Sequence, residues 1–195
     1  MDGHLGYLSI LVPYRPGIFK MLLRISFYLA AFIYLAAAIV LPSVDQWTQN
    51  QLEGLLKTVG QDDKQFSSAF DGFISTNATD FTWNGAHISR DEYKQKFQSQ
   101  AIFVQSVDVN FTNVVAEADD GGPLFPGGVG DVGLFYTVTF TESDSLRVPA
   151  TEAKFQSSIN VVVVNDIPPP PPSPIRGYFD GRRVIQVNQI VAKVN

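Results

Sequence analysis

The chain has 195 residues, of which 45% are hydrophobic and 17% are charged, a composition typical of one globular domain with an additional segment. Its net charge of −5 argues against a nucleic-acid partner, because phosphates repel an acidic surface. The absence of cysteine excludes disulfides, thiolate zinc sites and thiol nucleophiles.

A hydrophobic segment near the N-terminus predicts export. Between Met21 and Leu41 the only charged residue is Arg24. The segment is long enough to cross a bilayer, which needs about 20 apolar residues. It is also typical of a signal peptide, with a basic start and a cleavage site at the small residues 36–38. Both interpretations stay open.

The two interpretations agree on where the folded part lies. The basic residues precede the hydrophobic segment, so residues 45–195 are expected outside the cytosol. We predict an unstructured extension over residues 1–20, a signal peptide or signal anchor over residues 21–44, and one folded domain over residues 45–195. The protein is then secreted or, as the alternative, membrane-anchored through its N-terminal segment alone.

Two helices are predicted at the start of the folded part. Residues 45–59 carry leucines at helical spacing, and Asp45 is placed to cap this helix. Residues 62–74 form the second helix, which presents three aromatic rings on one face: Phe66, Phe70 and Phe73.

A short hairpin and a third helix follow. Asn84-Gly85 lies between residues that suit strands, and this pair favours a tight hairpin turn because both residues tolerate positive φ. Ser89 and Glu92 have the spacing of a capping box, which predicts that a helix begins at Arg90.

Long strands make up the remainder. Alternating apolar and polar residues predict strands over residues 103–112, 132–141, 151–165 and 182–191. The glycine-rich range 119–131 and the polyproline range 167–174 are predicted loops.

This order of elements resembles the SnoaL-like branch of the nuclear transport factor two-like superfamily. The aromatic second helix at 66–73, the element W-N-G-x-x-I-S-R-D-E-Y at 83–93 and the closing D-G-R-R-V-I-Q-V at 180–187 carry the resemblance. It implies an α+β fold, in which three N-terminal helices pack in a strongly curved, mostly antiparallel sheet. The result would be a cone-shaped α+β barrel with an internal pocket.

The resemblance also implies where a catalytic base would lie. In ketosteroid-isomerase-like members a carboxylate is placed on the hairpin strand after the second helix. The matching stretch here is 81–84, which contains no acid. Asp80 is adjacent, but strand alternation places it on the face opposite Phe81 and Trp83. We therefore expect binding rather than catalysis.

An enzyme remains the alternative. His87 is the only histidine after the hydrophobic segment, and histidine is the commonest general base near neutral pH. With Tyr93 as a hydrogen-bond donor, it would serve an isomerase, dehydratase or cyclase that needs no cofactor. No metal site is expected, because no second imidazole accompanies His87.

Our first hypothesis is a pocket for a small apolar molecule. Six rings are expected to line it: Phe70, Phe73, Trp83, Tyr93, Phe97 and Tyr136.

Two further expectations concern the surface. Sequons at Asn77 and Asn110 predict glycosylation of an exported chain, with Asn110 on the exposed face of its strand. The apolar run Val161–Val164 suits a strand that is covered on both faces or lies at a subunit contact. A homodimer through the sheet is the third hypothesis.

Overall fold

The computed structural model describes residues 41–101, 104–120, 126–142, 151–166 and 180–194. The predictions for residues 1–20, for most of 21–44 and for the polyproline range 167–174 lie outside these residues. All described residues belong to one compact unit that begins at Leu41. Within them, no helix is long and apolar enough to span a bilayer.

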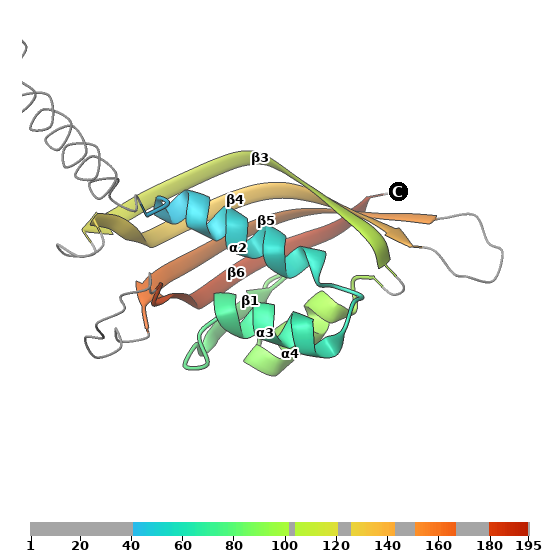
Figure 1. Ribbon diagram of the computed structural model, residues 1–195, viewed down its shortest axis with the longest axis horizontal. Helices are drawn as coiled ribbons and strands as arrows, with labels where there is room; N and C mark the ends of the chain where they lie inside the picture. The colour runs from blue at the N-terminus through green and yellow to red at the C-terminus, as the bar shows by residue number, and fades with distance from the viewer. Residues whose placement is uncertain (1–40, 102–103, 121–125, 143–150, 167–179, 195) are drawn as a thin grey trace, which may run out of the picture. The chain divides into compact units, whose positions relative to one another are not determined.

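The three predicted helices are present (Figure 1): α2 at Val44–Lys57, α3 at Asp63–Phe73 and α4 at Arg90–Gln98. Asp62 caps α3 by accepting a hydrogen bond from the Lys64 amide, at 3.1 Å. The predicted cap of α2 is wrong. Ser43 occupies the N-cap position without a side-chain hydrogen bond, and Asp45 lies in the first turn, where a carboxylate favours the positive end of the helix dipole.

The hairpin agrees with its prediction. Strands β1 (Asp80–Trp83) and β2 (Ala86–Ile88) pair in antiparallel register around Asn84 and Gly85. These two residues have φ of 50° and 82°, as a two-residue hairpin turn requires. The capping box that begins α4 is also confirmed, since Ser89 and Glu92 each accept a hydrogen bond from the other's backbone amide.

A six-stranded mixed sheet forms the centre of the fold, in the order β2-β1-β6-β5-β4-β3. The four long strands make an antiparallel meander, while β1 pairs with β6 in parallel. The α+β class is confirmed. The expected closed barrel is not, because β2 and β3 are two free edges; the cone shape stays a prediction. The long strands are β3 (Val104–Asp120), β4 (Pro126–Glu142), β5 (Thr151–Asn165) and β6 (Arg182–Val194).

The predicted loop over 119–131 is wrong at both ends, because residues 119–120 and 126–131 are strand, while 121–125 lie outside the described residues. Strand β3 continues to Asp120 and β4 begins at Pro126. Gly130 has φ of 136°, and a Cβ on it would lie 2.1 Å from the Glu117 carbonyl oxygen. Glycine is therefore required here because the two strands approach closely, and its presence does not mark a turn.

The sheet has two unlike faces. We call inner the face that carries Val132, Leu134 and Ile159, all buried in the core that the helices complete. Figure 1 shows α2 running along this side of β3 and β4. No described helix covers the other, outer face. Within the run 161–164, Val161 and Val163 are buried on the inner face, and Val162 and Val164 are only half-buried on the outer face.

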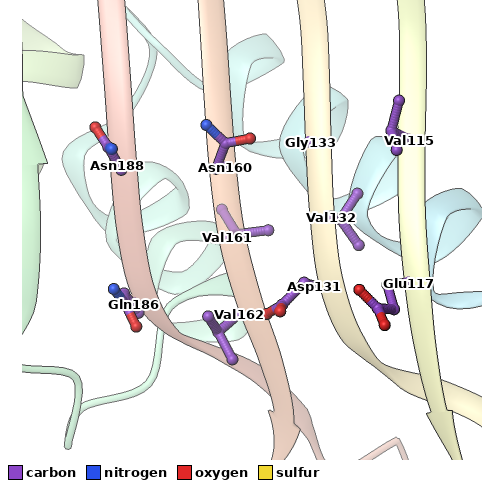
Figure 2. A pocket seen from close by; sticks show the side chains of 10 residues that line it. All are labelled: Val115, Glu117, Asp131, Val132, Gly133, Asn160, Val161, Val162, Gln186 and Asn188. Carbon is purple, nitrogen blue, oxygen red and sulfur yellow. The ribbon is translucent and has the colours of Figure 1, made fainter.

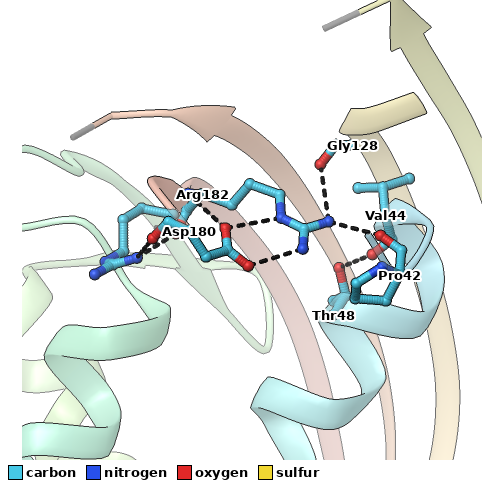
Figure 3. A network of polar contacts seen from close by, with 7 residues as sticks. Pro42, Val44, Thr48, Gly128, Asp180 and Arg182 are labelled. Carbon is cyan, nitrogen blue, oxygen red and sulfur yellow. Dashed lines mark hydrogen bonds and ion pairs between the residues drawn. The ribbon is translucent and has the colours of Figure 1, made fainter. Parts of the chain in front are cut away.

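A fully buried arginine joins distant segments at one end of the sheet (Figure 3). The Arg182 guanidinium forms two hydrogen bonds with the Asp180 carboxylate, at 2.9 and 2.8 Å, and donates to the Pro42 carbonyl at 2.8 Å. A weaker contact of 3.4 Å reaches the Gly128 carbonyl. The same group lies 5.1 Å from the centre of the Trp47 ring, a cation–π contact. Arg182 thus fixes the start of α2 against β4 and β6.

Arg182→Ala should lower the free energy of unfolding by about 3–5 kcal/mol, because it breaks a buried ion pair and removes the hydrogen bond that holds the Pro42 carbonyl at the start of α2. Urea unfolding of the full chain, followed by circular dichroism, measures the loss. The matched control is Arg183→Ala, which removes the neighbouring half-buried guanidinium and should cost less than about 1 kcal/mol. Equal losses in the two variants would contradict the role given to Arg182.

Candidate functional site

A cluster of aromatic rings surrounds Tyr93 on α4. Its ring centre lies 5.2 Å from Phe81, 5.7 Å from Trp83, 5.2 Å from Phe97 and 6.3 Å from Phe70. The cluster is built by α3, β1 and α4, and its rings meet in tilted or edge-on geometry, which aromatic pairs prefer. Only Trp83 is partly exposed, so the cluster is core with one accessible ring.

The Tyr93 hydroxyl belongs to a buried polar network with Tyr136, Ser157 and Gln189. Tyr93 donates to Gln189 Oε1 at 2.5 Å. Gln189 Nε2 donates to the Tyr136 hydroxyl and to Ser157 Oγ, both at 2.9 Å. None of the four residues is more than 6% exposed. The network therefore ties α4 to strands β4, β5 and β6 inside the core.

The hydrogen bonds determine which way the Gln189 amide points. Ser157 donates its single hydroxyl hydrogen to the Ile190 carbonyl, at 3.1 Å. It must therefore accept from Gln189, which places the amide nitrogen on that side and the amide oxygen toward Tyr93.

The two phenols of the network are neutral at physiological pH. Burial raises the pKa of Tyr136 to about 12, an effect partly offset by the hydrogen bond that it accepts from Gln189. Burial also raises the pKa of Tyr93 well above its usual value, and the nearby Tyr136 adds to this. The network can donate and accept hydrogen bonds, but its phenols cannot serve as bases near neutral pH.

The sequence contained a signal for Gln189 that our interpretation missed. Because side chains alternate along a strand, Gln189 shares a face with Val187 and Val191. Val187 is buried, so an amide is placed in the core, while Ile190 is 60% exposed on the outer face. Ser157 is likewise an inward-facing polar residue, next to Ile159 on the same face of β5.

The structure brings together four of the six predicted pocket rings: Phe70, Trp83, Tyr93 and Phe97. Tyr136 joins them through Gln189. Phe73 lies elsewhere in the core, with its ring 5.9 Å from Trp47.

The inner face beyond Tyr136 is apolar and only partly covered. Phe111 lies 5.9 Å from the Tyr136 ring, and Phe155 lies 6.0 Å from Phe140. Phe111 and Phe155 are half-buried against the core, as are Val107 and Val109. The polar network thus borders an apolar surface that the described helices leave partly open.

The structure does not bring His87 and Tyr93 together. The His87 side chain is 84% exposed on β2, where its ring nitrogen lies 3.7 Å from the Asp80 carboxylate. Tyr93 is completely buried. Phe81 and Trp83 contact the ring cluster while Asp80 is exposed, as strand alternation predicted.

The two predicted glycosylation sites are both exposed. The Asn77 amide donates to Asp166 at 3.4 Å. Asn110 pairs with Thr137 and lies on the outer face of the edge strand, as predicted. Modification of either residue stays a prediction. In the part of the chain that the structure describes, no three His, Asp or Glu side chains gather as a metal site would require.

The chain is similar to a solved structure only at low sequence identity. No protein-family model matches the chain, and no curated protein matches its sequence. The crystal structure of AclR, a proposed hydroxylase from Streptomyces galilaeus, matches over 76% of each chain with 10% sequence identity and a TM-score of 0.45.

Gln189→Leu should lower the free energy of unfolding by about 2–4 kcal/mol, because it leaves the hydroxyl groups of Tyr93, Tyr136 and Ser157 without their shared partner in the core. The matched control is Gln186→Leu, the same change at an exposed position of the same strand, with an expected effect within about 0.5 kcal/mol. Urea unfolding measures both. If Gln189→Leu proved neutral or stabilising, the network would not be a structural tie.

Proposed function

We propose that this chain is an exported, SnoaL-like domain that binds a small apolar molecule against the inner face of its sheet. The observation that carries the proposal is the half-buried apolar surface of Val107, Val109, Phe111 and Phe155 beside the buried network. Small-molecule sites are lined mainly by apolar and aromatic side chains with a few precisely placed polar groups, and this surface beside Tyr136 has that composition.

The order of elements supports the SnoaL-like assignment. Two helices, a hairpin and a third helix precede a four-stranded meander. The predicted export segment supports a location outside the cytosol, and the compact unit begins at Leu41, just where that segment ends.

The chemistry of the network favours binding over proton transfer. Its members are two phenols, an amide and a hydroxyl, and the pKa of both phenols is raised by burial. Proton abstraction near neutral pH needs a group that is unprotonated there, such as a carboxylate or an imidazole. The predicted imidazole, His87, lies on the surface. A ligand oxygen near Tyr136 would instead receive a hydrogen bond.

The test uses three probes with one apolar body and different oxygen groups: naphthalene, 2-naphthol and 2-acetylnaphthalene. Each should raise the thermal unfolding midpoint of the full chain, because a ligand that binds only the folded state stabilises it. Phe155→Ala should weaken binding of all three by removing apolar contact. Tyr136→Phe should weaken the binding of 2-acetylnaphthalene by about three- to tenfold, because it removes one hydrogen bond to the ligand. Binding of naphthalene should be unchanged.

Trp83 offers a second readout. In a Trp47→Phe background it is the only tryptophan, and its partly exposed ring should report a probe bound nearby. The matched control is Phe135→Ala, which removes a ring from the outer face and should leave probe binding unchanged. If no probe changes the unfolding midpoint or the Trp83 emission, the binding proposal fails.

A second candidate function, assembly through the sheet, is favoured by the outer face. The large apolar side chains that are most exposed among the described residues lie there: Val115 at 63%, Phe135 at 49% and Ile190 at 60%. Exposed apolar groups on an uncovered sheet often mark a protein interface.

Sedimentation equilibrium of the full chain in detergent at micromolar concentration tests this role. The wild type should sediment as a dimer and Phe135→Asp as a monomer, because a buried unpaired charge at the contact costs several kcal/mol. The matched control is Thr139→Asp, which lies on the same face four residues along β4 from Phe135 and should remain a dimer. A monomeric wild type would exclude the assembly role.

A further inference from the structure

The outer face also carries a groove of about 530 Å³ at the end of the sheet opposite the half-open apolar surface (Figure 2). Its lining comes from four neighbouring strands, and the polar residues are exposed. Two carboxylates, three amides, one glycine and four valines line it, and Val115 among them also belongs to the exposed apolar residues of the outer face: Glu117, Asp131, Asn160, Gln186, Asn188, Gly133, Val115, Val132, Val161 and Val162.

The two carboxylates lie side by side. Glu117 on β3 and Asp131 on β4 are direct partners in the strand register, so both project from the same face. Like charges in this position destabilise a sheet unless a cation lies between them. None of the described lysine, arginine or histidine side chains forms an ion pair with either carboxylate. Both carboxylates are exposed to solvent and lack a cationic partner among the described residues.

The three amides complete the groove beside the carboxylates. Asn160 and Asn188 are partners across β5 and β6, and Gln186 pairs with Val162. The described hydrogen bonds include none from these three side chains, so each can both donate to and accept from a ligand. Figure 2 shows all three on the same side of the sheet as the carboxylates.

Gly133 makes room for the central amide. A Cβ at this position would lie 2.9 Å from Asn160 Oδ1, closer than side chains normally approach. The glycine therefore leaves room for the Asn160 amide, whose oxygen points toward strand β4 in Figure 2. The shape of the groove at its centre therefore depends on Gly133 and Asn160.

We propose that this groove binds a small hydrophilic molecule that carries both a protonated amine and several hydroxyl groups, the chemistry of an amino sugar. Glu117 and Asp131 would hold the amine by charge-assisted hydrogen bonds, while the amides of Asn160, Gln186 and Asn188 would bind the hydroxyl groups. The groove volume lies within the range of small-molecule sites. This site is separate from the apolar one, because it lies on the opposite face of the sheet.

The test compares D-glucosamine with D-glucose, which carries a neutral hydroxyl in place of the amine, at slightly acidic pH. When glucosamine is added to the full, isotope-labelled chain, the side-chain amide signals of Asn160 and Asn188 should change their chemical shifts. Glucose should bind at least about tenfold more weakly, because it loses the charge-assisted contacts. Glu117→Gln combined with Asp131→Asn should weaken glucosamine by a similar factor.

Matched variants separate the groove from general charge. Asp108→Asn combined with Glu152→Gln removes two exposed acids, one on β3 and one on β5, that lie outside the groove, and glucosamine affinity should stay within about twofold. Gly133→Ala keeps the charge but displaces Asn160, so it should weaken glucosamine severalfold. Equal affinity for the two sugars, or equal loss in both double variants, would overturn the proposal.

Two further outcomes distinguish this site from the other proposals. Naphthalene binding should be unchanged in Gly133→Ala, so that failure of either ligand site leaves the other standing. Phe135→Asp should retain glucosamine binding. If that substitution abolished it while the chain stayed folded, the groove would belong to the contact between two copies, and the amino-sugar proposal would be overturned.

Discussion

The side-chain amide of Gln189 joins three strands and one helix inside the core. An amide buried there must form its hydrogen bonds within the protein, because an unpaired buried polar group costs about 1–3 kcal/mol. Its oxygen and nitrogen reach Tyr93, Tyr136 and Ser157. The position of α4 on the sheet, and with it the ring cluster around Tyr93, depends on these contacts.

Arg182 imposes a similar constraint at one end of the sheet. Its charge is fully buried, so it requires the Asp180 carboxylate and the Pro42 carbonyl. The two buried polar groups act on different parts: Gln189 orders the helix α4, and Arg182 orders the start of α2. Together these two residues fix α2 and α4 against the inner face of the sheet. The outer face carries no described helix. The sheet can thus offer an apolar surface on one side and a polar groove on the other.

Local elements were predictable because they depend on neighbours in the sequence. The turn at Asn84-Gly85 and the capping box of Ser89 and Glu92 formed as expected, since both are closed by contacts within a few residues. The predictions that were wrong depend on contacts between residues that are far apart in the sequence. The range 119–131 looked like a loop because glycine is common in turns, yet Gly130 serves the close approach of two strands. His87 was a candidate base by residue type alone, and it lies on the surface.

The sequence by itself determined the α+β class, the three helices, the hairpin and the alternation of the strands, because residue spacing encodes these directly. Only the tertiary structure decided which side chains meet. The contact of Tyr93 with Gln189 joins residues 96 positions apart, and the Glu117–Asp131 pair depends on the register of two strands. Such contacts follow from how the strands pair and pack, and residue type and local spacing carry too little information to specify them.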